Sequence, residues 1–289
     1  MVDCIIIGTG AAGVSAALTL KALKKEFVWL GNRELSFKIR GAEKIKNYAG
    51  LPSVSGGGMQ SAFLNQIKAE GIEITEAKVS GVYPADGGYT VMCGQQVYET
   101  RTVILATGVE AVKPVRGESE FLGRGVSYCA VCDGFLYKGK DIAVAIDSDE
   151  EESEVKLLAG YARTVHLFRL KKCREIVGEN IINESGSISE IVGDMRVRAV
   201  VSGGSEIAVD GVFMLKQAVA ADKIVYGLKT EGGHVVVDRA LKTNLAGVYA
   251  AGDITGRPYQ YAKAVGEGNV AAYSVNAYLS AAVSEKSGV

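Results

Sequence analysis

The chain has 289 residues, of which 48% are hydrophobic and 36 are glycine. Its 32 basic and 33 acidic residues nearly cancel, which excludes a global electrostatic attraction to nucleic acid. No segment approaches the roughly 18 apolar residues of a membrane span, and Met1 leads directly into an apolar stretch, which leaves no room for a signal peptide. The length suits two domains, and we expect a soluble, cytoplasmic α/β protein that binds neither membrane nor nucleic acid.

A β-α-β pattern opens the chain. Residues Val2–Ile7 predict a buried strand, Gly8–Gly13 a glycine-rich turn into a helix that ends near Lys24, and Phe27–Leu30 the next strand. In such a turn the first glycine permits a tight bend, the second lets the backbone approach a pyrophosphate, and the third lets the helix pack on the strand. The phosphate then meets the helix N-terminus. The acid that usually follows the second strand is missing; Glu34 is the nearest candidate for a ribose hydroxyl, and a solvated loop charge is an equal alternative.

Two further strands end in turns of small residues. Val103–Gly108 is an apolar run ending in Ala-Thr-Gly, and Gly247–Asp253 ends in Gly-Asp. An acid at such a strand end can bind the ribityl hydroxyls of a flavin, while an N-cap or turn aspartate is the alternative for Asp253. A long helix, roughly Tyr261–Leu279, closes the chain, and its positive end would face the flavin ring. Together with the first glycine turn, these signals favour a flavin site.

The middle of the chain predicts a second unit of alternating strands and helices. Its expected elements are a strand Asp141–Ile146, a helix near Glu151–Ala162, a strand Thr164–Phe168, two hairpin-like strands around Ser187–Ser202 and a strand near Gly211–Leu215. We therefore expect two Rossmann-like domains, the second inserted into the first: residues 1–113 with 226–289, and residues 114–225.

Cys129 and Cys132 lie two residues apart, and Asp133 follows them directly. Two thiols at this spacing can close a small, easily reduced disulfide ring, and an adjacent acid can supply the proton that thiol–disulfide exchange requires. Half of a structural zinc site is the alternative. No second cysteine pair is present, and His166 and His234 are the only histidines, so we expect no metal.

In order along the chain, Gly8–Gly13, Asn47–Gly50, Ala106–Gly108, Gly125–Gly134 and Gly247–Asp253 resemble the motifs of the low-molecular-weight thioredoxin reductase family. The resemblance implies the FAD/NAD(P)-binding flavoprotein disulfide reductase fold, a homodimer with FAD in each subunit, thioredoxin as substrate, and a rotation that exposes the disulfide to flavin and to thioredoxin in turn. It also implies that Cys132 faces the flavin, that Cys129 attacks the substrate disulfide, and that Asp133 exchanges the proton.

The resemblance likewise implies a set of FAD-binding residues. Near the ring the chain departs from the family pattern, because Ser36–Arg40 replaces a Gly-Gly-Gln loop and Tyr259–Ala262 replaces Tyr-Arg-Gln-Ala. We still expect FAD to bind, with Tyr259 and Tyr261 shielding or stacking on the ring. The expected FAD-binding residues are Gly8, Gly10, Ala11, Ala12, Gly13, Glu34, Lys38, Asn47, Ala106, Thr107, Gly108, Gly252, Asp253, Gln260, Tyr261 and Ala262.

The second nucleotide loop of the family is missing. After the strand that ends at Ile146, residues 147–154 hold six acids and no glycine. Two like charges 4 Å apart repel by about 4 kcal/mol at an effective dielectric constant of 20, so a pyrophosphate is disfavoured there. The alternative is that these acids face solvent at a helix N-terminus, which still leaves no glycine cradle. The arginine pair that grips a 2′-phosphate and the Ile-Gly after the last strand are also replaced, by Phe168–Lys172 and by Lys216-Gln217.

The dithiol therefore needs another electron source, and a subgroup of this family with a degenerate nucleotide domain uses ferredoxin. A ferredoxin near −400 mV is about 130 mV below thioredoxin near −270 mV, roughly 6 kcal/mol downhill for two electrons.

Two basic clusters are candidate docking surfaces for an acidic ferredoxin, although solvated faces are the simpler interpretation: Arg169, Lys171, Lys172 and Arg174; and Lys38, Arg40, Lys44 and Lys46. The alternatives are an NADPH-dependent reductase with an atypical site, a non-catalytic flavin-binding sensor, and a small-molecule dithiol oxidase.

Overall fold

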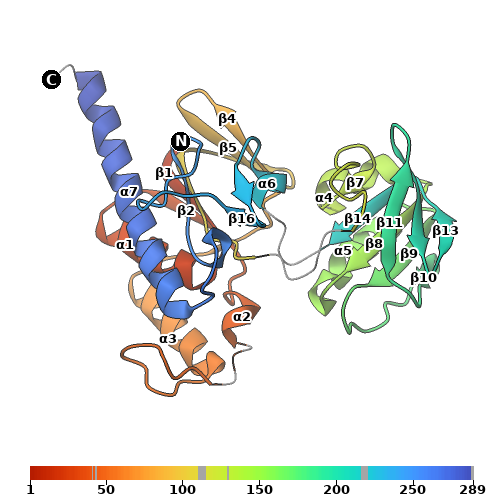
Figure 1. The fold of residues 1–289 in the computed structure, drawn as a ribbon, viewed down its shortest axis with the longest axis horizontal. Coiled ribbons are helices and arrows are strands. Elements are labelled where there is room, and N and C mark those ends of the chain that lie inside the picture. Colours follow the sequence, from red (N-terminus) through yellow and green to blue (C-terminus); the bar gives the residue numbers. More distant parts are fainter. Residues whose placement is uncertain (41, 43, 110–114, 129, 216–220, 288–289) are drawn as a thin grey trace. The chain divides into compact units, whose positions relative to one another are not determined.

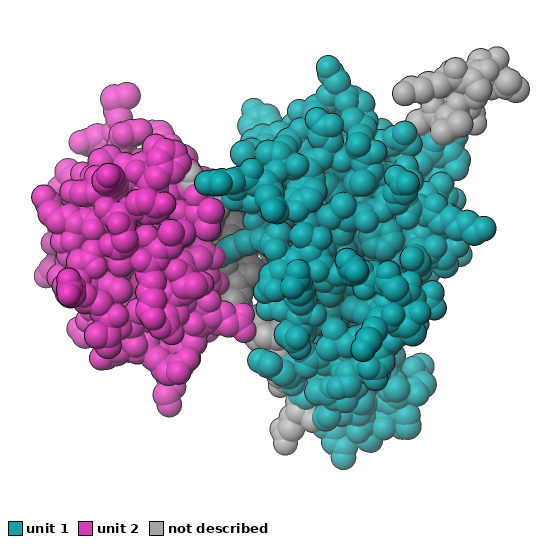
Figure 2. All heavy atoms as spheres, turned by 180° about the vertical axis from the view of Figure 1, so that it is seen from behind, with its two compact units in different colours: residues 1–109, 220–289 teal, residues 110–219 magenta. Residues whose placement is uncertain are grey.

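The computed structural model describes every residue except 41, 43, 110–114, 129, 216–220 and 288–289 (Figure 1). The chain divides into two compact units, coloured separately in Figure 2: residues 1–109 with 220–289, and residues 110–219. The predicted α/β fold, with one unit inserted into the other, is confirmed. The predicted boundaries, after residues 113 and 225, fall a few residues beyond the observed ones. Within the described residues, no helix has the length and apolar character needed to cross a membrane.

The first unit is built on a seven-stranded sheet with the order β3-β2-β1-β6-β5-β4, to which β17 is added alongside β6. β1, β2, β3 and β17 form the parallel part with β6, and β4, β5 and β6 form an antiparallel meander. The strands are β1 (Val2–Ile7), β2 (Phe27–Gly31), β3 (Thr75–Glu76), β4 (Gly81–Ala85), β5 (Gly88–Cys93), β6 (Gln96–Leu105) and β17 (Val248–Ala250). β15 (Thr230–Glu231) and β16 (His234–Val235) form a separate hairpin.

Helices enclose the apolar core of this sheet. They are α1 (Ala11–Ala22), α2 (Phe37–Arg40), α3 (Gly56–Ala69), α6 (Ala221–Ile224) and α7 (Tyr261–Ser287). α1 is rich in alanine, which allows α7 to pack closely on it, and residues of both helices share one core with Trp29 and Tyr249. α3 begins where the Ser55 hydroxyl accepts a hydrogen bond from the Gly58 N–H at 3.1 Å, a regular N-cap.

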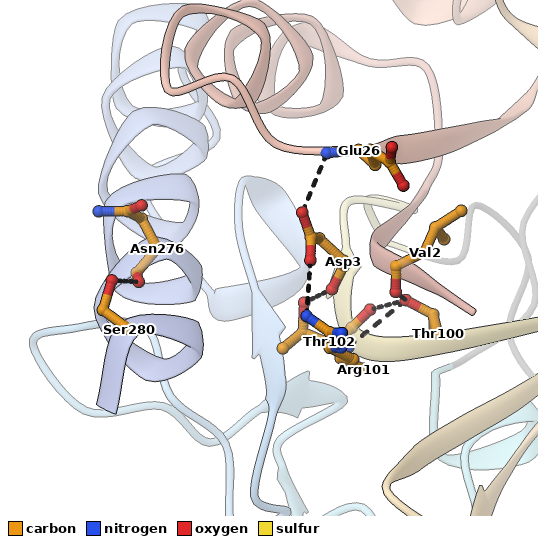
Figure 3. A network of polar contacts seen from close by, with 8 residues as sticks. All are labelled: Val2, Asp3, Glu26, Thr100, Arg101, Thr102, Asn276 and Ser280. Carbon is orange, nitrogen blue, oxygen red and sulfur yellow. Dashed lines mark hydrogen bonds and ion pairs between the residues drawn. The ribbon is translucent and has the colours of Figure 1, made fainter. Parts of the chain in front are cut away.

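A polar network ties β1 to its neighbours at the amino ends of the parallel strands (Figure 3). The Asp3 carboxylate accepts hydrogen bonds from the Glu26 N–H and from the Arg101 guanidinium, both at 3.1 Å. The Thr102 hydroxyl donates to the Asp3 carbonyl at 2.7 Å. Because ligands of open α/β sheets bind beyond the carboxyl ends of the strands, this network stabilises the sheet at the end opposite to the candidate site.

The second unit contains a parallel five-stranded sheet with the order β10-β9-β8-β14-β7 and an antiparallel sheet β11-β12-β13. β8 alternates between two cores: Ala143 and Ala145 pack toward the antiparallel sheet, and Ile142, Val144 and Ile146 toward α5. The elements are β7 (Val126–Ser127), α4 (Ala130–Asp133), β8 (Asp141–Ile146), α5 (Glu152–Ala159), β9 (Thr164–Arg169), β10 (Ile181–Asn183), β11 (Ile188–Gly193), β12 (Val197–Ser202), β13 (Ser205–Ala208) and β14 (Gly211–Leu215).

Several elements of the second unit differ from the prediction in detail. The helix expected near Glu151–Ala162 is shorter, because a 3-10 turn over Asp149–Glu151 precedes α5 and Gly160 forms its C-cap. β13 follows β12 through the Gly203-Gly204 turn and was not predicted.

Candidate functional site

The glycine turn Gly8–Gly13 joins β1 to α1 under tight constraints. Gly8 has φ 110°, and a Cβ at this position would lie 2.4 Å from the Ala106 carbonyl oxygen. A Cβ on Gly13 would lie 2.0 Å from the Gly8 carbonyl oxygen, which also accepts a hydrogen bond from the Trp29 indole at 2.9 Å. The first glycine is therefore needed for the tight bend and the third for close packing, as the sequence pattern predicted.

Gly10 differs from the other two glycines because it faces open space. It is the N-cap of α1, no side chain caps this helix end, and a Cβ added there would meet nothing within 4 Å. Ala11 and Ala12 form the buried first turn, and a Cβ on Gly252 would lie 3.0 Å from that of Ala12. The N-terminus of α1 thus combines room with a positive helix end, the arrangement that binds phosphate.

The turn Ala106–Gly108 at the carboxyl end of β6 contains an unsatisfied polar group. Thr107 Oγ1 is the one buried side-chain nitrogen or oxygen without a hydrogen-bond partner in the described part of the chain. Such groups are rare because their desolvation is uncompensated, so a ligand hydroxyl or ring atom would fit here. Lys38 lies beside this turn: its Nζ donates to the Val109 carbonyl at 2.9 Å and lies 3.6 Å from the position of a Cβ on Gly108.

Two hydrogen bonds join the segment after β2 to the start of α7. The Tyr261 hydroxyl donates to the Lys38 carbonyl at 2.8 Å, and the Asn47 amide donates to Gln260 Oε1 at 2.7 Å. Ala262 follows on the exposed side of the same helix start. The structure therefore brings four predicted FAD-binding residues together as two pairs, Lys38 with Tyr261 and Asn47 with Gln260. The two members of each pair are more than 200 positions apart in sequence.

Asp253 follows β17 and begins a 3-10 turn, Asp253–Thr255. Partial burial raises the pKa of its carboxyl, and the nearby ammonium groups of Lys38 and Lys263 oppose that rise. Asp253 thus lies in the electrostatic range of Lys38, beside the Ala106–Gly108 turn. A half-buried acid close to lysines is suited to bind hydroxyl groups of a ligand.

Lys263 and Glu267 hold this turn in place, and sequence reasoning missed both. Glu267 Oε2 accepts hydrogen bonds from the Gly252 N–H and the Thr255 hydroxyl, each at 2.8 Å. Lys263 Nζ donates to the Gly252 and Gly256 carbonyls at 2.8 Å and pairs with Glu267 at 3.2 Å. The available signal was a lysine and a glutamate four residues apart in the helix that follows Gly-Asp.

Glu34 is exposed in the loop after β2. Its N–H donates to Asn32 Oδ1 at 2.7 Å, and its carbonyl accepts a hydrogen bond from the Gln60 amide. The structure gives no contact between its carboxylate and the other described site residues, so the ribose role stays a prediction.

The predicted dithiol lies in the second unit. Cys129 is outside the described residues, and of Cys132 the structure describes only its place in α4, so their roles stay predictions. Asp133 ends α4, and its Oδ2 accepts a hydrogen bond from the Ser127 hydroxyl at 2.6 Å. The motif is thus anchored to β7, the edge strand of the parallel sheet.

The acidic segment after β8 is partly buried and paired within the unit. Asp147 is 6% exposed and pairs with Lys171 at 3.2 Å, and Glu151 is also buried. The Arg174 N–H donates to Asp149 at 2.8 Å and lowers the pKa of that carboxyl. The alternative that these acids face solvent at a helix N-terminus is therefore only partly right: Asp149 and Glu150 are exposed in the 3-10 turn before α5, whereas Asp147 and Glu151 are buried.

The same contacts involve residues of the first predicted basic cluster, Arg169, Lys171, Lys172 and Arg174. Lys171 and Arg174 bind acids of the segment after β8, and Arg169 pairs with Glu175 at 3.5 Å. Three of the four basic side chains thus form ion pairs within the unit. The other predicted position near this site, Lys216-Gln217, is outside the described residues.

Comparison with known proteins gives one consistent family. A family model described as pyridine nucleotide-disulphide oxidoreductase matches residues 2–146 and 177–268. A thioredoxin reductase of Listeria innocua is 30% identical over 298 residues, which cover 96% of this chain and 93% of the relative.

Solved structures agree over the whole length. A ferredoxin-flavin thioredoxin reductase from Clostridium acetobutylicum is 39% identical, with a TM-score of 0.92, and the match covers 96% of this chain and 97% of that one. A thioredoxin reductase from Gloeobacter violaceus is 28% identical, with a TM-score of 0.82 and coverage of 97% and 94%. The family generally binds FAD. The order of the motifs, the inserted α/β unit and these full-length matches lead to one conclusion: the chain belongs to the low-molecular-weight thioredoxin reductase family of flavin disulfide oxidoreductases.

Proposed function

We propose that this protein reduces thioredoxin with electrons from a ferredoxin, which pass through FAD and the Cys129–Cys132 pair. The main support for this proposal comes from the carboxyl end of β8. A dinucleotide bound there would need glycines that let its pyrophosphate approach the backbone. Buried Asp147 stands there instead, paired with Lys171, and Asp149 pairs with Arg174. A pyrophosphate would have to displace these pairs and lie against carboxylates, which is why we exclude NADPH as the donor. The similarity to a ferredoxin-flavin thioredoxin reductase supports the same donor.

The residues of the first unit fit FAD. The open N-terminus of α1 at Gly10 suits the pyrophosphate, and the unsatisfied Thr107 Oγ1 and the half-buried Asp253 suit polar groups of the cofactor. The Lys263–Glu267 pair keeps the Asp253 turn in position through hydrogen bonds to its backbone. When bound, FAD supplies the chemistry that links one-electron transfer from a ferredoxin to the two-electron reduction of a disulfide.

The second unit carries the disulfide chemistry. Two electrons and two protons convert the Cys129–Cys132 disulfide to a dithiol, and the Cys129 thiolate then attacks the thioredoxin disulfide. Asp133 exchanges protons with the sulfurs. Transfer from a ferredoxin near −400 mV to thioredoxin near −270 mV releases about 6 kcal/mol for two electrons, so the direction of flow needs no further input.

An apolar surface beside the motif suits a protein substrate. Val131, Phe135 and Leu136 are 48%, 58% and 54% exposed, although residues of this size are usually buried. They flank Cys132 and Asp133 in sequence, which supports thioredoxin docking over this turn. We further propose that the protein is a cytoplasmic homodimer, as is implied by the family resemblance.

Anaerobic reduction of the FAD-loaded protein tests the donor. Reduced ferredoxin should bleach the flavin absorbance and, with oxidised thioredoxin present, generate thioredoxin thiols. Excess NADPH or NADH should leave the flavin oxidised, because the nucleotide has no site. Rapid bleaching by NADPH would overturn the ferredoxin assignment in favour of an NADPH-dependent reductase.

Cysteine variants test the path after the flavin. Cys129→Ser and Cys132→Ser should each keep FAD and accept electrons from ferredoxin but produce no thioredoxin thiols. If both variants lost FAD, the cysteines would be structural. Peroxide release from a small dithiol by the unmodified protein would instead indicate a dithiol oxidase.

A further inference from the structure

Ser127 makes a contact that the family motif does not explain. It is the last residue of β7 and is 5% exposed, and its main chain pairs in register with Phe213 of β14. Its hydroxyl donates to Asp133 Oδ2 at 2.6 Å. This hydrogen bond closes the chain segment that contains both cysteines, from two residues before Cys129 to the residue after Cys132.

The geometry suits orientation of a carboxylate. At 2.6 Å this O–H···O bond is at the short end of the usual range for such bonds, so the Ser127 hydroxyl holds the carboxyl closely. The donor is fixed, because Ser127 belongs to a strand paired with the centre of the sheet and is shielded from water. The acceptor, Asp133, is the last residue of the four-residue helix α4. One oxygen of the Asp133 carboxyl is thus held by the strand.

We propose that Ser127 is a positioning residue for disulfide exchange: its hydrogen bond fixes the Asp133 carboxyl for proton exchange with the dithiol. The inference rests on the proposed function, in which Asp133 carries the proton. Misplacement of a proton donor by about 1 Å can cost roughly 10²-fold in rate, so a bond that fixes the carboxyl is worth testing kinetically.

The exchange can be written with its atoms balanced. The Cys129 thiolate bonds to one sulfur of the substrate disulfide, the substrate S–S bond breaks, and the released sulfur takes the proton of the Asp133 carboxyl. The Asp133 carboxylate then takes the proton of the Cys132 thiol. The Cys132 sulfur attacks the Cys129 sulfur and expels the second substrate sulfur as a thiolate, which leaves an enzyme disulfide and reduced substrate. Ser127 keeps its own proton throughout.

The test uses FAD-loaded protein that is fully reduced by a chemical reductant, so that the natural donor is irrelevant. It is mixed with oxidised thioredoxin or with a small aromatic disulfide, and the rate of thiol formation is measured. Ser127→Ala should lower the maximal rate by roughly 10- to 100-fold with an unchanged KM. Ser127→Thr, which keeps the hydroxyl, should restore most of the rate. Ser189→Ala, which removes an exposed hydroxyl in β11 of the same unit, should behave as the unmodified protein.

A double-variant cycle separates positioning from a structural role. If Ser127 acts through Asp133, Ser127→Ala should cost little further rate in an Asp133→Asn background. Equal losses in both backgrounds, a raised KM with an unchanged maximal rate, or failure of Ser127→Thr to recover the rate would overturn the proposal. If the unmodified protein reduces the small disulfide but not thioredoxin, the proposed substrate is wrong while the cycle still tests Ser127. Reduction of neither would overturn both.

Discussion

At the scale of single residues, Glu118 shows how a buried charge can stabilise the first residues of the second unit. The side chain is 1% exposed, and each carboxylate oxygen is engaged: Oε2 accepts the Val115 N–H at 2.7 Å, and Oε1 accepts the Tyr128 hydroxyl at 2.8 Å. Val115 is the first described residue after the junction between the units, and Tyr128 directly precedes Cys129. One acid therefore ties the start of the unit to the dithiol motif.

Replacement of this acid by its amide is informative because the shape is kept. In Glu118→Gln one of the two oxygen acceptors becomes an N–H donor, so either the Val115 N–H or the Tyr128 O–H loses its acceptor. We expect a loss of about 1–3 kcal/mol in the free energy of unfolding, measured by urea denaturation of the FAD-loaded protein. Glu120→Gln is the matched control, since Glu120 is exposed two residues away, and should leave the unfolding midpoint unchanged. Equal midpoints for both variants would contradict the role given to Glu118.

At the scale of elements, the contact between α1 and α7 depends on one glycine. A Cβ on Gly268 would lie 2.1 Å from the Ala12 carbonyl oxygen, so the two helices can approach only because this side chain is absent. Two residues earlier in α7, a Cβ on Gly266 would meet nothing within 4 Å. The same substitution is therefore expected to have opposite effects at the two positions.

Gly268→Ala should force the helices apart near the glycine turn, lower stability by about 1–3 kcal/mol and weaken FAD retention. Gly266→Ala should stabilise the protein by about 0.5–1 kcal/mol, because alanine favours the helix and the space is open. Thermal unfolding and the ratio of flavin to protein absorbance after dialysis measure both effects. The idea fails if the two variants shift in the same direction.

Elements with strong local signals were predictable from the sequence, whereas contacts between distant segments were not. The first glycine turn and the closing helix were predicted because their small residues and periodicity act locally. β13 was missed because Ser205–Ala208 is short and half polar, and its strand form depends on pairing with β12. The burial of Asp147 was missed for the same reason: Lys171, 24 residues away, neutralises it. The Lys263–Glu267 support of the Asp253 turn likewise depends on the bend between β17 and α7.

At the scale of the whole molecule, the net charge is too small to attract a charged partner, so only local charged surfaces can do so. The net charge is −1, so the acidic ferredoxin that we propose as donor gains no attraction from the global field and needs a local positive surface. In the first cluster, Arg169, Lys171 and Arg174 pair with acids of their own unit. In the second cluster, Arg40, Lys44 and Lys46 are exposed, and no ion pair of the described residues includes them. This cluster directly precedes Asn47, which binds Gln260 at the proposed flavin site.

Charge reversal distinguishes the two clusters. Lys46→Glu should slow flavin reduction by reduced ferredoxin by roughly 10-fold at low ionic strength, and the difference should shrink as salt screens the encounter. Lys172→Glu changes the net charge by the same amount on an exposed side chain of the other cluster, so it controls for global charge and should have little effect. The measurement is the second-order rate constant of flavin bleaching at several salt concentrations. A larger effect from Lys172→Glu than from Lys46→Glu would place ferredoxin docking on the second unit, because only the local field at the true encounter surface changes the association rate.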